Sequence, residues 1–594
     1  MLGVRAMLAL VSIGLAATPA LAQTPPRDDS ITVTGTRDRL SNWRVAETDH
    51  VIVLSDGKEA ELVRVAQNLE RLHFMLSALL GRTESPDNTV KLRITLVGDD
   101  AQFAEMRLKN TRAQPGPYAA AFRNALYYDP RDDGAVMAAS RYDQDIELRR
   151  GTDLNGFLRS VQLLPDQVTP PGMGPQGQGA GAVDPVPYTG QTVQFVGPGD
   201  MSVKINELSL TIPAESRIYA GYAQHYLLTY FPNAYPRWYV DGFGELVATV
   251  AIKDNNEIEF GRPPVDYAKV LDNHLSYPAA KVLTGAYLTD KKASERWTPY
   301  HAWVLTHMLF FNDERRQQLR AYLAKIASGY TLAEAVAAFG DLDKLQRDLA
   351  VYDNRKVPYV RVNFPAALAD APIVRRLTEG QAAFVKGQLE LGPRVTVPPA
   401  GDPALAALRA AAIAERDKWL EKLRGDAQRY KNNREAQLLL AEAECRSGHA
   451  FECLAAAERA LAIDPASSDA LAWKGAGQTG MALAASNRAA GLKKARATLA
   501  RANRDNPESP LPLILYYRSY ADAGETPPDV AVEGLMKAAD TVPAAPGPRL
   551  LLGEALAKRG AIEAARRTLI PVAHGAYESP EAAEARVLLA GLPG

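Results

Sequence analysis

The chain has 594 residues, 47% of them hydrophobic and 23% charged, and at about 150 residues per domain this length predicts three or four domains. Its 68 Lys and Arg residues nearly balance its 69 Asp and Glu residues. This balance argues against a basic nucleic-acid groove, an acidic solvating tail or a polybasic membrane patch. Two cysteines exclude a disulfide scaffold and any cysteine-rich zinc or iron–sulfur module, and eight histidines leave little material for a histidine-built metal site.

The N-terminus has the three parts of a secretory signal peptide. A basic start ends at Arg5, an apolar run covers residues 6–17, and small residues follow at Ala20 and Ala22. We therefore predict a signal peptide at residues 1–22 and an exported protein, periplasmic or extracellular. The alternative, an uncleaved anchor, requires about 20 apolar residues. No later stretch is long and apolar enough to suggest a membrane span.

A mixed α and β pattern follows a polar stretch at residues 23–42, which predicts a flexible leader. From Trp43 onward, short apolar runs alternate with segments of helical periodicity. Extended segments are expected at 50–55, 91–97, within 119–141, at 257–260 and at 357–364. Helices are expected at 58–80, 214–231, 236–252, 299–311, 314–327, 331–339 and 342–352.

Two segments of loop composition divide the chain. Residues 163–200 contain Pro-Pro-Gly-Met-Gly-Pro-Gln-Gly-Gln-Gly-Ala-Gly, a composition that buries too little apolar surface to order itself. We predict a flexible insertion there and a linker at residues 391–402. These boundaries predict one domain at residues 43–390 and a second at residues 403–594.

The second domain is rich in Ala, Leu, Arg and Glu and has recurring helix pairs. Pro465, Pro507 and Pro543 each follow a helical run, at spacings of 42 and 36 residues. Residues 430–592 resemble degenerate tetratricopeptide repeats, whose period is about 34 residues. The resemblance implies an all-α helical solenoid and a protein or peptide partner bound through residues 403–594. No nucleic-acid partner is expected.

Both cysteines lie in this domain and flank the turn of one helix pair. Antiparallel helices joined by such a turn bring their ends within disulfide range, and export supplies an oxidising compartment. We predict a disulfide between Cys445 and Cys453. The alternatives are two free core thiols, or a zinc site with His449 that lacks a fourth ligand.

The stretch 219–247 contains the most informative motif. It reads Tyr-Ala-Gly-Tyr-Ala-Gln-His and later Pro-Arg-Trp-Tyr-Val-Asp-Gly-Phe-Gly-Glu. It resembles the zinc-binding core of the peptidase-MA-like (gluzincin) family of exported bacterial proteins, His-Glu-Tyr-Ala-His-His followed by Pro-x-Trp-x-x-Glu-Gly-Phe-Ala-Glu-Tyr. The resemblance covers about residues 43–360. It implies an α+β gluzincin-like metallopeptidase domain in front of the tetratricopeptide-like solenoid.

The resemblance also implies that the zinc site has been lost. The two zinc histidines fall on Ala220 and Gln224, and the general-base glutamate falls on Gly221. In the working family two histidines four apart grip the metal and the glutamate activates its water. Ala and Gly do neither, and restoring Glu at Gly221 should favour the helix by roughly 1 kcal/mol. The third ligand falls on Asp241, and the next family glutamate is kept as Glu245.

Neighbouring histidines do not replace the missing ligands in sequence. His225 is one residue beyond Gln224 and is turned about 100° from it around the helix. His301 and His307 are six apart, a poor spacing for a shared helix face. No cofactor is therefore expected, and zinc is expected only if the chain is an active enzyme.

Asp241 and Glu245 are candidates for a remnant metal site, but an ion pair is the favoured interpretation. They are four apart on one helix face and repel each other unless a cation such as Arg237 lies between them. The aromatic residues around them predict either core packing, which is favoured, or a ligand cleft; they are Tyr219, Tyr222, Tyr226, Tyr230, Phe231, Tyr235, Trp238 and Tyr239.

The sequence thus predicts an exported pseudopeptidase that binds or scaffolds a protein or peptide through its helical repeats. The alternative is an active gluzincin-type hydrolase with an unconventional metal site. A third hypothesis makes the front domain a spacer for an assembly scaffold. A phosphate-binding glycine loop and a Gly-x-Ser-x-Gly elbow are both missing from the sequence.

Overall fold

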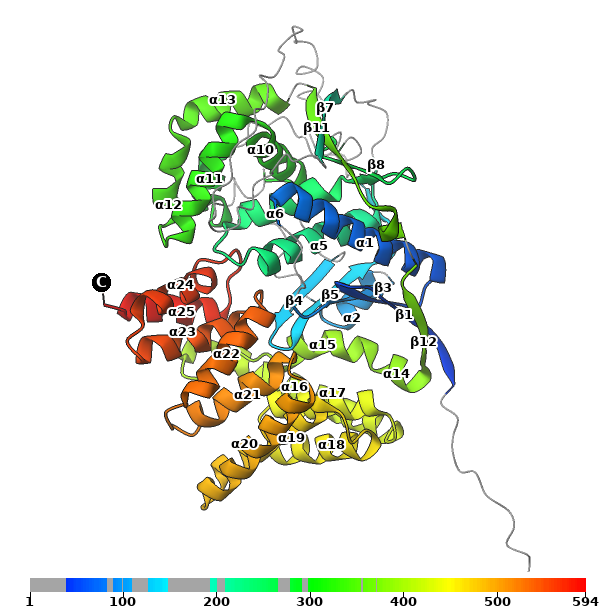
Figure 1. The fold of residues 1–594 in the computed structure, drawn as a ribbon, viewed down its shortest axis with the longest axis vertical. Helices are drawn as coiled ribbons and strands as arrows, with labels where there is room; N and C mark the ends of the chain where they lie inside the picture. Colours follow the sequence, from blue (N-terminus) through cyan, green and yellow to red (C-terminus); the bar gives the residue numbers. More distant parts are fainter. Residues whose placement is uncertain are drawn as a thin grey trace, which may run out of the picture. The chain divides into compact units, whose positions relative to one another are not determined.

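The structure is a computed structural model. It describes residues 39–82, 89–98, 100–108, 126–147, 193–199, 209–264, 278–290, 297–353, 356–369 and 371–593 (Figure 1). The predicted signal peptide at residues 1–22, most of the leader and residues 163–192 of the predicted insertion lie outside this part. Within it, no helix combines the length and the apolar character needed to cross a membrane.

A six-stranded sheet organises the N-terminal α/β region. Its order is β12-β1-β2-β3-β5-β4, with parallel pairing of β2 to β3 and of β3 to β5 and antiparallel pairing elsewhere. β4 therefore forms one edge. The strands are β1 (Leu40–Glu47), β2 (Val51–Ser55), β3 (Leu92–Val97), β4 (Leu126–Arg131), β5 (Gly134–Ser140) and β12 (Ile373–Thr378).

Most of the predicted helices of this region are present, because their apolar residues recur at helical spacing. The helix predicted at 236–252 is too long: it ends at Ala248, and residues 251–252 form a strand paired with residues 258–259. α1 (Glu59–Leu80) is buried along Leu62, Leu69 and Leu76 and packs on β1, β2 and α5. The others are α2 (Asp100–Glu105), α5 (Ala214–Tyr230), α6 (Arg237–Ala248), α8 (Ala279–Leu283), η1 (Ala286–Leu288), α10 (Pro299–Phe311), α11 (Asp313–Ala327), α12 (Leu332–Ala335), η2 (Val336–Phe339), α13 (Leu342–Asp353) and η3 (Ala366–Ala369).

Two smaller sheets complete the region, and one of them corrects the predicted insertion. A four-stranded sheet has the order β7-β11-β10-β9, and β6 pairs with β8. The strands are β6 (Gln144–Glu147), β7 (Val193–Gly199), β8 (Ser209–Ile212), β9 (Ala251–Ile252), β10 (Glu257–Phe260) and β11 (Val357–Asn363). The prediction of a flexible insertion through residue 200 is wrong at β7, because pairing with the distant β11 orders residues 193–199.

The domain boundaries also differ from the predicted ones. β1 begins at Leu40, inside the predicted leader, because it pairs with both β2 and β12. The α/β region ends with β12, and α14 (Glu379–Ala383) and α15 (Val385–Val395) follow directly. α15 therefore covers the first part of the predicted linker at 391–402. Its Leu391 joins the helical core around Trp419, whereas its Leu389 packs with side chains of the six-stranded sheet.

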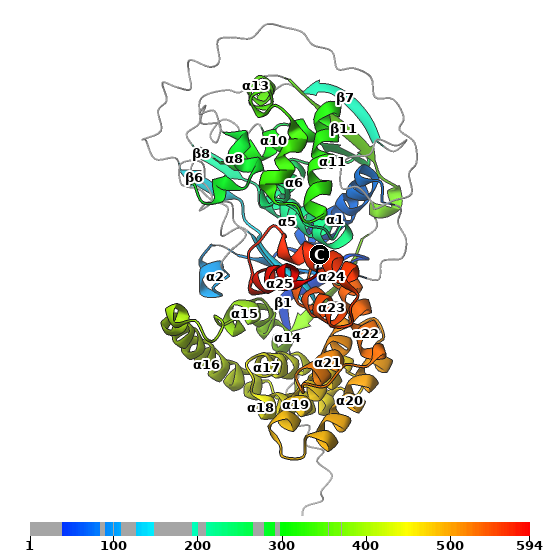
Figure 2. The ribbon, with the colours of Figure 1, turned by 90° about the vertical axis from the view of Figure 1, so that its left-hand side faces the viewer.

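The C-terminal region is all-helical. After η4 (Pro403–Leu405) its helices are α16 (Ala406–Arg429), α17 (Arg434–Arg446), α18 (Ala450–Ile463), α19 (Ser468–Ala484), α20 (Arg488–Asp505), α21 (Pro510–Ala521), α22 (Asp529–Thr541), α23 (Pro546–Lys558), α24 (Ile562–Ala573) and α25 (Pro580–Gly591) (Figure 2). Each helix packs on the next, and α19 also packs on α17 and α21. Helix pairs that stack in this way form a helical-repeat arrangement.

Left-handed glycines recur at the turns within these helix pairs. Gly448 follows α17 with φ 83°, and Gly560 follows α23 with φ 76°. L-residues rarely adopt this backbone conformation, so glycine ends the first helix of each pair without strain.

The β4–β5 hairpin connects the α/β region to the helical region. The guanidinium of Arg131, at the end of β4, donates to the carbonyl oxygens of Gln388 (2.6 Å) and Leu389 (3.3 Å) in α15. The backbone N–H of Val90 donates to the carbonyl oxygen of Thr541 at the end of α22 (3.2 Å). The α/β region therefore contacts both α15 and the C-terminal end of α22.

Candidate functional site

The positions of the peptidase-like motif lie on α5 and α6, which pack closely against each other. The helices approach at Gly244, where a Cβ would lie 3.2 Å from the carbonyl oxygen of Ala220 and 3.0 Å from Nε2 of Gln224. The structure therefore brings the two aligned zinc-histidine positions next to the helix that carries the aligned carboxylates. Ala220 is buried and Gln224 is partly exposed.

Gly221, the aligned general-base position, faces the six-stranded sheet. A Cβ at this position would lie 2.6 Å from Cδ1 of Leu126 on β4 and 2.7 Å from Sδ of Met137 on β5. Both of these side chains belong to the main hydrophobic core. The expectation that glutamate at this position favours the helix is therefore wrong in this environment, since the carboxylate would enter space filled by leucine and methionine.

Asp241, the aligned third zinc ligand, is 2% exposed and pairs with Arg237 of its own helix. Nε of Arg237 lies 3.3 Å from Oδ2 of Asp241. Burial raises the pKa of Asp241 to about 6, while Arg237 and the Tyr577 hydroxyl oppose the rise and Glu245 adds to it. Tyr577 precedes α25, and the guanidinium of Arg237 lies 5.5 Å from the centroid of its ring.

Glu245 forms an ion pair with Arg217, an arginine that the sequence pattern does not single out. Both of its oxygens accept from the guanidinium of Arg217 on α5, at 2.8 and 2.9 Å. The two side chains are 6% and 7% exposed. Arg237 thus pairs with Asp241, and a separate bidentate, buried ion pair between Arg217 and Glu245 links α5 to α6. Both carboxylates already have a cationic partner from the protein.

The described part of the chain brings together no group of three His, Cys, Asp or Glu side chains suited to hold a metal ion. His225 lies 2.9 Å from the Tyr128 hydroxyl, and burial lowers its pKa to about 3. His307 contacts the Tyr352 hydroxyl and two backbone carbonyls, and His301 contacts the hydroxyl of its N-cap threonine. Each of these histidines has a hydrogen-bond partner inside the core.

The aromatic residues of α5 and α6 pack in or against the main hydrophobic core. The first three of them on α5 point their hydroxyls at polar side chains of α1, at 2.8–2.9 Å: Tyr219 at Asn68, Tyr222 at His73 and Tyr226 at Ser77. Trp238 and Tyr239 of α6 are fully buried. A buried tyrosine usually finds such a partner for its hydroxyl, so these contacts explain why α1 carries polar residues on a buried face.

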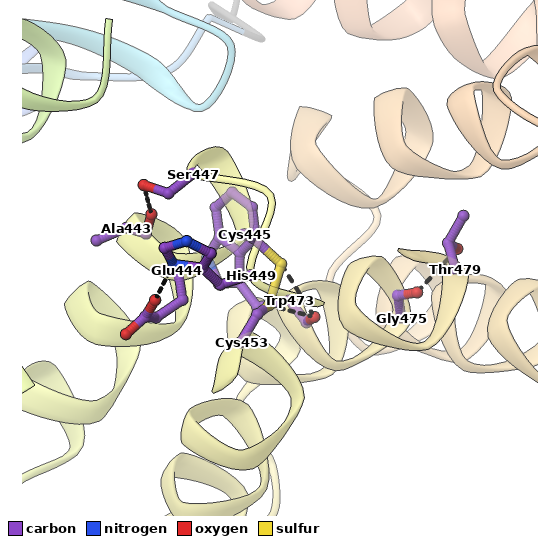
Figure 3. The surroundings of a disulfide bond; sticks show 9 residues. All are labelled: Ala443, Glu444, Cys445, Ser447, His449, Cys453, Trp473, Gly475 and Thr479. Carbon is purple, nitrogen blue, oxygen red and sulfur yellow. Dashed lines mark hydrogen bonds and ion pairs between the residues drawn. A yellow bond between two sulfur atoms is a disulfide. The ribbon is translucent and has the colours of Figure 1, made fainter. Parts of the chain in front are cut away.

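The two cysteines form a disulfide at the turn between α17 and α18 (Figure 3). The Cα atoms of Cys445 and Cys453 are 5.1 Å apart, and both sulfurs lie 3.4–3.9 Å from the carbonyl oxygen of Trp473. Nδ1 of His449 points away from the sulfurs to Oε2 of Glu444, at 2.8 Å. Of the three alternatives left open by the sequence, the structure has the disulfide, and it has neither the free thiols nor the zinc site.

A cavity of about 410 Å³ lies between α17, α19 and α21, beside this disulfide. Its wall is apolar along part of two helices and polar elsewhere. The apolar side chains include Trp473, Leu511, Ile514 and Leu515, and the polar ones include Asp132, Arg446, Thr479, Arg518 and Ser519. This mixture of apolar surface and a few convergent polar groups is typical of ligand sites in proteins.

The sequence predicts a partner bound through residues 403–594 without naming the side chains of this cavity, and Asp132 lies outside that range altogether. It belongs to the β4–β5 turn, far from the helices in sequence, and the pattern of residues 119–141 predicts only two extended segments. The Asp-Gly pair at Asp133 and Gly134 is a typical hairpin signal. That signal predicts a turn, but nothing local indicates that the turn enters the helical region.

Comparisons with known proteins add little to this geometry. No family model and no curated protein matches the chain. Among solved structures it is similar to a thermophilic TPR protein of Thermus thermophilus, with 20% identity and a TM-score of 0.26 over 32% of this chain and 92% of the other. A likeness of this size carries no argument, and the peptidase resemblance finds no support. The chain has an N-terminal α/β region and a C-terminal all-helical region consistent with a helical-repeat solenoid.

Proposed function

We propose that this chain is a binding protein that holds a segment of a protein or peptide in the cavity between α17, α19 and α21. The observation that supports this proposal is the cavity itself: three successive first helices of the repeats contribute to one wall, which is apolar around Trp473 and polar around Arg518. Side chains presented by stacked helices form binding surfaces of this kind in repeat proteins. The cavity volume of about 410 Å³ lies within the usual range for ligand sites.

The same proposal makes the α/β region an inactive relative of gluzincin peptidases, in an exported protein. It is supported by the residues at the aligned ligand positions, since Ala220 and Gly221 carry no metal-binding atom in their side chains. It is also supported by Asp241 and Glu245, which arginines of the protein already hold. In this proposal the α/β region has a structural role, and its β4–β5 hairpin forms part of the wall of the binding cavity.

The binding proposal is tested with the mature chain, residues 23–594, and a positional-scanning library of hexapeptides. Replacement of Ala476, which lines the cavity, with tryptophan should fill the space and weaken binding of the selected peptides at least tenfold. The matched control is Ala583→Trp on the exposed side of α25, which should leave binding unchanged. Binding that persists in the Ala476→Trp variant, or is absent from the unmodified chain, would contradict the proposal.

The loss of the peptidase site is tested on the same purified chain. It should contain no stoichiometric zinc by elemental analysis and should not cleave casein or peptide libraries. Tightly bound zinc together with cleavage would instead support the alternative of an active hydrolase.

A further inference from the structure

The β4–β5 turn occupies one end of the binding cavity. Oδ1 of Asp133 lies 3.6 Å from the guanidinium of Arg446 on α17. Oδ1 of Asp132 lies 2.8 Å from the position that a Cβ on Gly547 would take, in the first turn of α23. Asp132 also belongs to the cavity wall itself. The turn therefore places a carboxylate from the α/β region between two helices of the helical region.

The side chain of Asp132 has no cationic partner in the described part of the chain. Neither a hydrogen bond nor an ion pair within 4.0 Å involves its carboxylate there. The neighbouring carboxylates do have cations: Asp129 with Arg131 (2.7 Å), Glu442 and Asp133 with Arg446 (2.8 and 3.6 Å), and Asp522 with Arg518 (3.8 Å). Around the turn, carboxylates thus outnumber the guanidiniums that pair with them.

Electrostatic shifts agree with this excess of negative charge. Burial raises the pKa of Asp132, and the nearby Asp133 and Glu581 add to the rise while Arg446 and Arg518 oppose it. Burial and Asp133 likewise raise the pKa of Glu442 to about 7. An additional cation placed beside Asp132 would relieve this repulsion, whereas an additional carboxylate would increase it.

Part of the cavity wall is apolar. Trp473 and Leu511 are almost fully buried and leave one side toward the cavity, and Leu515 is partly exposed. The guanidinium of Arg446 lies 5.9 Å from the centroid of the Trp473 ring, so this ring is already positioned beside a cation. A lysine or arginine side chain combines a charged end with an apolar stem and suits such a surface.

We propose that the segment held in this cavity is cationic and apolar: a lysine or arginine pairs with Asp132, and apolar neighbours pack on Trp473 and Leu515. This inference rests on the proposed binding function and adds the chemistry of the partner. An acidic segment is disfavoured at this position, because its carboxylate would face Asp132 and the nearby Arg446 already pairs with Glu442 and Asp133.

The test compares three matched peptides taken from the hexapeptide selection, which differ only in having Lys, Gln or Glu at the preferred position. By fluorescence anisotropy in about 50 mM salt, where charged interactions are weakly screened, the Lys peptide should bind the mature chain at least tenfold more tightly than the Gln peptide. Asp132→Asn should reduce this preference to less than twofold, and Asp132→Lys should reverse it in favour of Glu. The matched control is Glu533→Gln on the exposed side of α22, which should change nothing.

A second measurement does not depend on any variant. Raising the salt concentration to about 500 mM should weaken binding of the Lys peptide and leave binding of the Gln peptide nearly unchanged, because salt screens only the charged interaction. Tight binding of Gln or Glu peptides without a preference for Lys would overturn this inference and leave the binding function intact. A library in which nothing binds the unmodified chain would overturn both.

Discussion

Replacing Gly221 with glutamate tests whether α5 packs on β4 and β5 as closely as the structure shows. This is the residue that the peptidase resemblance aligns with the general base. A Cβ at this position would lie 2.6 Å from Leu126 and 2.7 Å from Met137, and Met137 has no exposed surface. Both neighbours would have to move before the rest of the glutamate side chain could be placed.

Three contributions determine the expected change in the free energy of unfolding: the first stabilises the variant and the other two destabilise it. Helix propensity favours glutamate over glycine by at most about 1 kcal/mol. Overpacking of a filled core costs about 1–3 kcal/mol. Burying a polar group without a partner costs about 1–3 kcal/mol in protein mutants, and more for a charged one. We therefore expect the Gly221→Glu variant to be less stable by about 1–5 kcal/mol. Gly221→Ala combines the steric cost with the same gain in helix propensity and should be less stable by about 0–2 kcal/mol.

The assay is urea unfolding followed by tryptophan fluorescence, since Trp238, Trp297 and Trp303 are buried in the α/β region. The matched control is Gly425→Glu on the exposed side of α16, where a Cβ meets no atom within 4 Å. That variant should be more stable by about 0.5–1 kcal/mol. A Gly221→Glu variant as stable as the unmodified chain would refute the packing and indicate that position 221 opens into a cavity, as a working zinc site requires.

Three further predictions concern buried charge and the disulfide. Arg217→Met or Glu245→Gln alone should destabilise the chain by about 3–5 kcal/mol, because each leaves a buried charge unpaired; additive losses in the double variant, measured by urea unfolding, would contradict a direct pair. Burial raises the pKa of Asp241 from 3.8 to about 6, so the folded chain keeps this proton to a higher pH than the unfolded chain does. The stability that the bound proton contributes is therefore fully present below about pH 4 and is lost as the pH rises to about 6. Over that window the loss is about 3 kcal/mol, and Asp241→Asn should remove this part of the pH dependence of unfolding. Reducing the bond between Cys445 and Cys453, eight residues apart, should lower stability by about 2–3 kcal/mol in the chain-entropy model, and denatured, unreduced protein should show no thiol that reacts with a labelling reagent.

Most helices could be predicted because their signals are local. The apolar spacing in α1, the prolines that precede α5 and α6, and the Thr-Pro start of α10 all lie within a few residues of the feature that they specify. The hairpin of β4 and β5 likewise has its turn signal between its strands. The repeat pattern of the helical region follows from proline and glycine positions that the sequence displays directly.

Strand pairing between distant segments could not be predicted. The sequence pattern does not predict β12, although this strand completes the sheet beside β1, and it places the residues of β7 in a flexible insertion. Neither segment has a strong alternating pattern of apolar and polar residues. Each is held in place by backbone hydrogen bonds to a strand far away in sequence, which local patterns do not show. The packing of α15 could not be predicted either, because its Leu391 and Leu389 belong to two different hydrophobic clusters whose other members are far away in sequence.

For the candidate sites, the sequence alone established which side chains are available: no histidine pair at residues 220 and 224, two carboxylates four apart on α6, and two cysteines flanking one turn. Only the tertiary structure decided what surrounds them. It placed Leu126 and Met137 opposite Gly221, and it paired Glu245 with Arg217 of the neighbouring helix. It also carried Asp132 into a cavity of helices about 300 residues or more later in the chain. Hydrophobic periodicity specifies which face of an element is buried, but the partner of that face depends on how the elements pack.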